Sequence, residues 1–242
     1  MSAKRGIFVA PFGQLFDPRV LAGLARTAEG AGFDGFFLWD HVRYSPPSLE
    51  VADPWVALTA IALATERVTI GPLVTPVSRR RPHKLARETI TLDRLSGGRL
   101  VLGAGLGSDN HGEFADFEAV VEPRERARLL DAGLDRLAAH WREFAPSPVQ
   151  QPRIPVWIAA RYPNRRPMRR AERWDGLFPI DLPGPEAVAE IRAEVDVADL
   201  VVTNPAGTDT RPWFDAGATW CLTGFGPQPT EAAVRAAIAA GP

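Results

Sequence analysis

The fold is decided by residues 82–107, which read PHKLARETITLDRLSGGRLVLGAGLG. Proline opens an amphipathic segment that predicts a helix, and a Ser-Gly-Gly turn ends it. An apolar run over residues 100–104 then predicts a buried strand. Glycines follow at 103, 105 and 107, where the strand gives way to an open loop. Helix, tight turn, strand and loop in this order form the repeating unit of an α/β barrel, which binds ligands at the carboxyl ends of its strands.

The same alternation runs along the rest of the chain. Short apolar runs predict strands and amphipathic segments predict helices, so we expect parallel strands joined by right-handed crossovers. The first two helices are predicted to begin at Asp17-Pro18 and Asp53-Pro54, because aspartate caps a helix and proline fits its first turn. Eight strands are predicted, over residues 6–10, 35–39, 68–74, 100–104, 156–160, 176–178, 200–203 and 219–223.

Eight such units favour a closed (βα)8 TIM barrel of the α/β class, in which residues 1–242 form a single domain with short insertions. An open doubly wound sheet would be favoured by a Gly-x-Gly-x-x-Gly turn after the first strand. That strand leads instead into Pro11-Phe12-Gly13, which does not match. The proline-rich segment 146–155 is interpreted as a connection between a helix and a strand.

Composition excludes several classes of protein. A formal net charge of −1 argues against a nucleic-acid or anionic-membrane binder, which would carry a basic excess. The single cysteine, Cys221, excludes an internal disulfide and fits a reducing compartment. The amino-terminal apolar run is shorter than that of a signal peptide, and no stretch approaches the length of a membrane span. We therefore expect a cytoplasmic enzyme or binding protein.

Polar residues gather in the loops that follow the predicted strands, on the side of a barrel where catalysis occurs. Three of the four histidines, His41, His83 and His111, are expected on this rim. Two arginine clusters, at residues 79–81 and 161–166, join them. A cationic rim suits an anionic, phosphorylated ligand.

Each of these features also has a simpler interpretation. Asp40-His41 can form an ordinary turn at a strand end, and the arginines at 79–81 can solvate the start of a helix. The three glycines can serve tight packing alone. Asp109, His111 and Glu113 suggest a metal site, but their spacing fits no standard zinc pattern, and no metal ligand is assigned.

Three segments resemble the luciferase-like monooxygenase family of barrel oxidoreductases, which use flavin mononucleotide (FMN) or the deazaflavin coenzyme F-420. The first is GFDGFFLWDH at 32–41. The second joins the strand at 70–75 to TLDRLSGGRLVLGAGLG at 91–107. The third combines IPVWIAA at 154–160 with RRAERWDG at 169–176.

The resemblance implies roles for two groups of residues. Asp40 and His41 would lie beside the reactive ring and exchange a proton during hydride transfer, which makes them the candidate catalytic residues. The third strand would end in a non-prolyl cis peptide at Leu73-Val74 that supports the ring, with Thr75 bonded to its polar edge.

The remaining cofactor contacts are expected at two further strand ends. Gly103, Gly105 and Gly107 would leave room for the ring. Ala159 and Ala160 stand where the family often has phosphate-binding glycines, and Arg161 would add a charge-assisted contact.

The Asp-His pair and the arginines favour coenzyme F-420 over FMN. The first cofactor implies hydride transfer to or from a small-molecule substrate, whereas reduced flavin implies monooxygenation. Two alternatives remain open: a metal-dependent barrel hydrolase or isomerase, and a barrel that binds cofactor without turnover. The resemblance also makes a homodimer possible.

Overall fold

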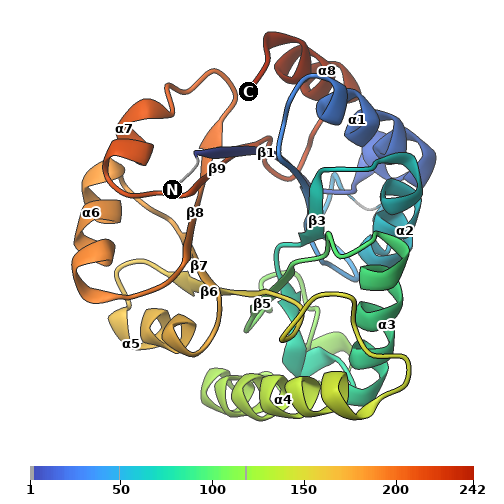
Figure 1. The fold of residues 1–242 in the computed structure, drawn as a ribbon, viewed down its shortest axis with the longest axis vertical. Coiled ribbons are helices and arrows are strands. Elements are labelled where there is room, and N and C mark those ends of the chain that lie inside the picture. Colours follow the sequence, from blue (N-terminus) through green and yellow to red (C-terminus); the bar gives the residue numbers. More distant parts are fainter. Residues whose placement is uncertain (1–2, 49, 118) are drawn as a thin grey trace.

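Strands and helices alternate along the chain, and the strands form a ring with the helices outside it (Figure 1). The computed structural model describes residues 3–48, 50–117 and 119–242. The strands are β1 (Lys4–Val9), β2 (Gly35–Leu38), β3 (Thr69–Pro72), β4 (Thr75–Pro76), β5 (Leu102–Gly105), β6 (Val156–Arg161), β7 (Gly176–Ile180), β8 (Asp199–Pro205) and β9 (Trp220–Gly224). The helices are α1 (Pro18–Gly30), α2 (Pro54–Ala64), α3 (Pro82–Leu95), α4 (Pro123–Glu143), α5 (Arg165–Arg169), α6 (Pro185–Glu194), α7 (Arg211–Asp215) and α8 (Glu231–Ala240).

All strand pairs in the sheet are parallel, in the order β3-β2-β1-β9-β8-β7-β6-β5-β4. β3 lies within the strand predicted over residues 68–74, and the strand stops at Pro72 and resumes as β4 beyond the predicted end. The ring closes where β4 pairs with β5 and where Ile70 bridges to Leu100. The predicted (βα)8 barrel is thus confirmed, and the eight predicted strand positions all coincide with observed strands.

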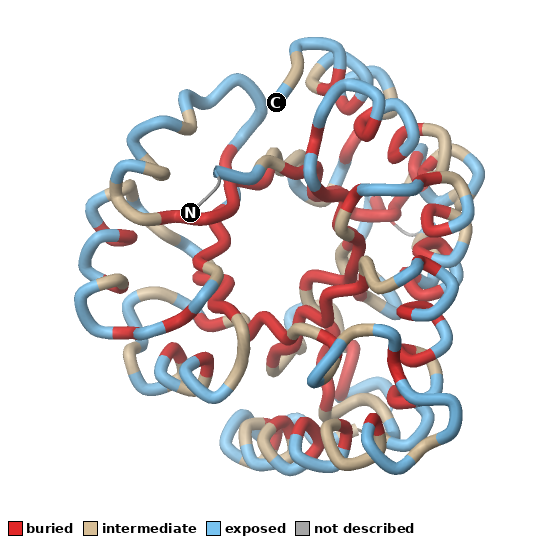
Figure 2. The backbone as a smooth tube through the Cα atoms, viewed as in Figure 1, coloured by how far each residue is buried: buried red, intermediate tan, exposed pale blue. Residues whose placement is uncertain are grey.

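Large apolar side chains fill the inside of the ring, as expected for a small barrel. The buried members of this inner cluster are Phe8, Phe37, Leu73, Val101, Trp157, Phe178, Val201, Trp220 and Leu222. The Trp157 ring fits because residue 176 is a glycine, since a Cβ at that position would lie only 2.4 Å from the ring. Figure 2 shows the buried residues concentrated along this ring and on the inner sides of the helices.

Both predicted Asp-Pro helix starts are confirmed. The Asp17 side chain accepts a hydrogen bond from the backbone N–H of Arg19, and Asp53 accepts two, from Trp55 and Val56. These bonds satisfy N–H groups that have no partner within the first helical turn. The helices that follow therefore start at fixed points after their strand loops.

The Ser-Gly-Gly-Arg turn is anchored at the amino-terminal end of the barrel by two charged residues, the half-buried Arg99 and the buried Asp93. Gly97 and Gly98 both adopt positive φ, at +69° and +85°, which glycine does without a steric penalty. Arg99 donates to the carbonyl oxygens of Ala62, Thr65 and Val68, at 2.9–3.0 Å.

Asp93 supplies the second anchor. Its carboxylate is buried and accepts hydrogen bonds from the backbone N–H groups of Val149 and Gln150, at 2.7 and 3.2 Å. These bonds fix the proline-rich segment, which connects α4 to β6, against α3.

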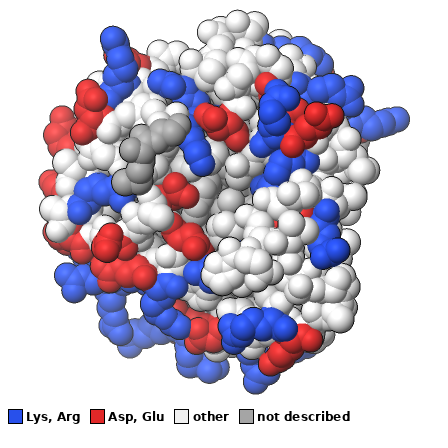
Figure 3. Space-filling view, viewed as in Figure 1, with Lys and Arg blue, Asp and Glu red and all other residues white. Residues whose placement is uncertain are grey.

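The surface carries charges of both signs. On the face seen in Figure 3, acidic and basic side chains are interspersed. Within the described ranges, no helix has the length and hydropathy that crossing a lipid bilayer would demand.

Candidate active site at the carboxyl end of the barrel

Asp40 lies just beyond the end of β2 and is completely enclosed by hydrogen-bond donors. Its side chain is 0% exposed. The carboxylate accepts from Thr75 Oγ1 at 2.7 Å and from Trp55 Nε1 at 3.3 Å. It also accepts from the guanidinium groups of Arg79 and Arg80, with shortest distances of 3.0 and 2.9 Å. Asp40 therefore acts on its neighbours, because a ligand has no access to its oxygens.

His41 is the accessible member of the predicted pair, with 20% of its side chain exposed. Its Nδ1 lies 2.7 Å from Oε2 of Glu113, whose side chain is only 2% exposed. The other Glu113 oxygen accepts from the Val42 N–H at 2.8 Å and from Arg79 Nη1 at 2.9 Å. One buried carboxylate thus orients the imidazole and joins the loops after β2, β4 and β5.

The electrostatic balance keeps Glu113 ionised. Burial pushes its pKa upward, but the hydrogen bond and charge of His41, the Val42 N–H and the Arg79 charge outweigh burial and hold the pKa below its ordinary value. Because a carboxylate only accepts, Nδ1 of His41 must carry the proton of their hydrogen bond. When Nδ1 carries the only ring proton, Nε2 is an acceptor.

In the sequence, Glu113 stands near Asp109 and His111, a group whose spacing fits no standard zinc site. In the structure, the three side chains have different partners. His111 Nδ1 lies 2.7 Å from Ser45 Oγ, and Asp109 accepts from the Phe114 N–H at 2.7 Å. Over the described ranges, no three His, Cys, Asp or Glu residues are grouped to hold a metal ion. The pairing of Glu113 with His41 left no periodic signal, since 72 residues separate them.

The carboxyl end of the barrel is called the mouth here. On one side of the mouth, aromatic rings lie next to His41. Tyr44 lies between the two histidines, with ring centroids 5.3 Å from His41 and 3.9 Å from His111. Burial and the nearby Glu113 charge raise the pKa of Tyr44, which therefore stays protonated at neutral pH. Phe12 and Trp39 complete this wall, at 5.6 and 5.8 Å from the imidazole of His41. Phe12 is buried, so the partly exposed Trp39 and Tyr44 provide the flat aromatic surface beside His41.

The peptide bond between Leu73 and Val74 is cis, as the resemblance implies. Leu73 belongs to the inner cluster, and Val74 is partly exposed above it. The Thr75 hydroxyl, expected to bond a cofactor, donates instead to the buried Asp40. The Thr75 side chain thus helps to hold the Asp40 carboxylate in place.

The three glycines predicted to make room for a ring pack closely against the third strand, so an added Cβ at each would meet protein atoms. A Cβ on Gly103 would lie 2.3 Å from the carbonyl oxygen of Pro72, and one on Gly105 would lie 2.7 Å from Val74 Cγ2. Gly107 has φ of +69°, and its Cβ would approach Pro76 to 2.8 Å. The third strand occupies this space, so the tight-packing interpretation holds.

The three residues of β6 that are predicted to contact a phosphate, Ala159, Ala160 and Arg161, lie in different environments. Ala160 is buried in the layer between strands and helices, whereas Ala159 is partly exposed at the mouth. Arg161 is exposed and forms an ion pair with Asp181, at the end of β7. The structure thus brings Val74, Gly105 and Ala159 together, and it pairs Arg161 with Asp181.

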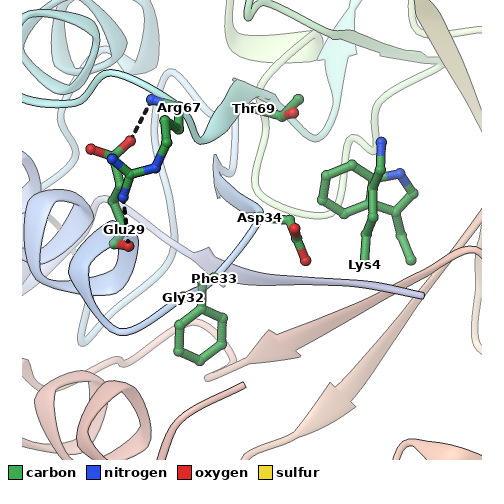
Figure 4. A pocket seen from close by; sticks show the side chains of 8 residues that line it. Lys4, Glu29, Gly32, Phe33, Asp34, Arg67 and Thr69 are labelled. Atoms are coloured by element: carbon green, nitrogen blue, oxygen red, sulfur yellow. Dashed lines mark hydrogen bonds between the residues drawn. The ribbon is translucent and has the colours of Figure 1, made fainter. Parts of the chain in front are cut away.

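A pocket of about 340 Å³ lies at the opposite end of the barrel, and none of the predicted site residues lines it (Figure 4). Its lining comprises Lys4, Glu29, Gly32, Phe33, Asp34, Arg67, Thr69 and Trp220. The Glu29 carboxylate accepts from the backbone N–H groups of residues 66, 67 and 68, at 2.6–3.0 Å. These bonds tie α1 to the start of β3, so this end serves stability, and the mouth is the candidate site.

The chain is similar to known proteins in sequence. A family model described as luciferase-like monooxygenase matches residues 4–200. An F420-dependent glucose-6-phosphate dehydrogenase of Nakamurella multipartita is 40% identical over 134 residues, which are 52% of this chain and 38% of that protein. Matches to uncharacterised mycobacterial proteins cover 60% of their length, so the chain spans less than two thirds of these curated relatives.

Solved structures share the fold at low sequence identity. An F420-dependent secondary alcohol dehydrogenase in complex with an F420-acetone adduct superposes with a TM-score of 0.79 and 15% identity, over 98% of this chain and 96% of that one. The oxygenating constituent of 3,6-diketocamphane monooxygenase from Pseudomonas putida, in complex with FMN, gives 0.68 and 17%, over 85% and 67%. Both are similar in the barrel itself.

Proposed function

This chain belongs to the luciferase-like monooxygenase family, and on that basis we propose that it is an oxidoreductase using coenzyme F-420 for hydride transfer with a small hydroxylated or carbonyl substrate. The observation that carries the proposal is the imidazole of His41, held by Glu113 at 2.7 Å with Nε2 left as an acceptor. Oxidising an alcohol to a carbonyl removes a hydride from carbon and a proton from oxygen. A base at this position takes the proton.

The mouth suits a planar cofactor. Trp39, Val74, Ala159 and Ile180 are partly exposed and pack on the inner cluster, so they offer an apolar floor on which a ring can lie. When bound, the deazaflavin supplies the carbon that accepts or returns the hydride. The chain supplies the floor, the aromatic wall and the proton acceptor.

His41, Glu113 and Asp40 have different parts in this proposal. His41 Nε2 accepts the hydroxyl proton as the hydride leaves, and Glu113 stabilises the imidazolium that forms. Asp40 is the buried counter-charge of Arg79 and Arg80 and acts through them. For the reverse reaction, protonated His41 returns the proton to the carbonyl oxygen.

Titration of the purified protein with coenzyme F-420 and, separately, with FMN tests the proposal through cofactor fluorescence. We expect a micromolar or lower Kd for F-420 and binding of FMN that is weaker by about tenfold or more. Secondary alcohols and sugar phosphates, the substrate classes named for the related dehydrogenases, are then screened by the loss of oxidised F-420 absorbance.

Each other outcome selects an alternative. Tighter binding of FMN would favour a flavin monooxygenase. Binding of F-420 without turnover of any compound would favour a cofactor-binding barrel that lacks catalysis. Absence of micromolar binding by either cofactor would refute the proposal, and stoichiometric zinc or manganese in active protein would favour the metal-dependent alternative.

A homodimer in the cytoplasm is part of the same proposal, and α2 indicates the contact surface. The helix reads PWVALTAIALA and carries no charged residue, although a helix at a solvent surface normally has a polar face. Val56 and Leu63 are 63% and 72% exposed. A groove of about 440 Å³ between α2 and α3 is lined by both apolar residues and charges of both signs, including Lys84 and Glu88. Such a surface can pair with a second copy of itself about a twofold axis.

A further inference from the structure

We propose that Arg79 is the positioning residue of the site: it keeps Glu113 ionised, and thereby fixes His41 in the tautomer whose Nε2 accepts a proton. This inference rests on the proposed role of His41 as a base. It concerns a residue that itself touches neither substrate nor cofactor in that proposal.

The geometry of Arg79 is that of a bridge between two acids. Its Nη1 donates to Glu113 Oε1 at 2.9 Å, and its Nη2 donates to Asp40 Oδ1 at 3.0 Å. The side chain is only 10% exposed. The guanidinium therefore connects the loop after β5 with the end of β2, from a position just after β4. The planar guanidinium uses two separate NH2 groups for this, whereas an ammonium would need its single nitrogen within hydrogen-bond distance of both carboxylates.

The charges explain why such a bridge is needed. Asp40 and Glu113 are both shielded from water, and two carboxylates in one enclosed region raise each other's affinity for protons. Arg79 contacts both acids and Arg80 contacts Asp40, so two positive charges balance two negative ones. Without Arg79, Glu113 would retain His41 as its one ionic contact among the described side chains.

Protonation of Glu113 would reverse its hydrogen bond with the imidazole. A carboxylic acid can donate its O–H to Nδ1 of His41, and the imidazole proton then resides on Nε2. In that tautomer Nε2 donates and cannot take the proton of a substrate hydroxyl. Arg79 prevents this exchange by favouring the ionised carboxylate.

Arg80 provides a matched control. It is adjacent in sequence, is similarly shielded and bonds Asp40 at 2.9 and 3.0 Å. In the described part of the chain it makes no hydrogen bond to Glu113. Replacing Arg80 removes the same charge from the same enclosed region without breaking the bond to Glu113.

The test is imidazole nitrogen NMR of the ligand-free protein, labelled with 15N-histidine, for wild type, Arg79→Met and Arg80→Met between pH 3 and 8. Carboxyl 13C signals report the titration of Glu113 in the same samples. We expect wild type and Arg80→Met to show His41 protonated at Nδ1. In Arg79→Met the Glu113 midpoint should rise by about 1–3 pH units, and the Nε2–H form of His41 should appear as Glu113 takes up its proton.

A wild-type tautomer and an unmoved Glu113 midpoint in Arg79→Met would overturn the proposal, as would equal changes in Arg79→Met and Arg80→Met. If Arg79→Met does not fold, Arg79→Gln decides in the same way, because its amide can still bond but carries no charge. The experiment uses no cofactor. Failure of the proposed function appears in the F-420 titration, and failure of this inference appears in the NMR spectra.

Discussion

His41 and Glu113 are 72 residues apart in the chain, yet their side chains meet at 2.7 Å. We expect His41→Ala and Glu113→Gln to lower kcat by about 10²–10⁴-fold, the range typical for loss of a general base. Affinity for coenzyme F-420 should change by less than about fivefold, since neither side chain forms the apolar floor. Steady-state kinetics with the best substrate of the screen and fluorescence titration measure the two effects. His140→Ala, on α4, is the control, and wild-type rates in both site variants would remove the pair from the mechanism.

Asp40 should affect turnover indirectly. Asp40→Ala removes the anion that holds both arginines, so we expect a loss in kcat together with a lower Tm, and this fall in Tm should exceed that of His41→Ala, which removes one hydrogen bond to Glu113. Thermal unfolding and kinetics of the two variants, measured side by side, separate the roles. An Asp40→Ala protein of unchanged Tm would contradict the placement of this carboxylate as a buried counter-charge.

Glu113 should also make stability depend on pH. Its pKa is lower in the folded protein than the ordinary value of 4.5, so the folded state binds its proton less readily than the unfolded state does. The stabilisation is therefore present above pH 4.5 and is lost as the pH falls through the lower, folded value. The difference in Tm between wild type and Glu113→Gln should shrink as the pH is lowered from 7 to 3. A difference that stays constant over this range would contradict the assignment.

The glycines of β5 give a prediction about packing. Gly103→Ala would bring a methyl group to 2.3 Å from a backbone oxygen, and backbone cannot move aside as a side chain can. We expect a loss of about 1–3 kcal/mol in the free energy of unfolding, measured with urea. Gly23→Ala, on α1 with no heavy atom within 4 Å of the new Cβ, should instead stabilise by about 0.5–1 kcal/mol. Equal effects of the two changes would show that the close approach at Gly103 is absent.

The surface of α2 predicts the oligomeric state. Light scattering after size exclusion should give a dimer for wild type and a monomer for Leu63→Glu, because a charge would be buried where two apolar helices meet. Val149→Glu, a change at an exposed valine away from α2, should leave the dimer intact. A monomeric wild-type protein would exclude this contact.

Sequence patterns determined the fold closely because each strand and helix carries its own local signal. The apolar run that predicts a strand at 156–160 is β6 (Val156–Arg161), and the Asp17-Pro18 start is the start of α1. Such signals depend on residues a few positions apart, and the strand at 68–74 was likewise located correctly. Its interruption after Pro72 was expected only from the family resemblance.

The site was less predictable, because its contacts join loops that are distant in sequence. His41 is predicted from the sequence, but Glu113 is assigned no role there, since nothing local shows that its carboxylate faces an imidazole. The arginines at 79 and 80 looked like part of a ligand-binding rim, whereas both are occupied by Asp40. The ion pairs form only when the ring of strands closes and brings distant loops together. The order of residues along the chain does not show which charges will meet.

Arg99 has a consequence for how this barrel can change over evolutionary time. One guanidinium at the amino-terminal end holds three carbonyl oxygens around the end of α2 and the start of β3. These contacts lie at the end of the barrel opposite to His41. Mutations in the loops of the mouth can thus accumulate without loosening this anchor, so new substrate preferences can be explored by a chain that continues to fold.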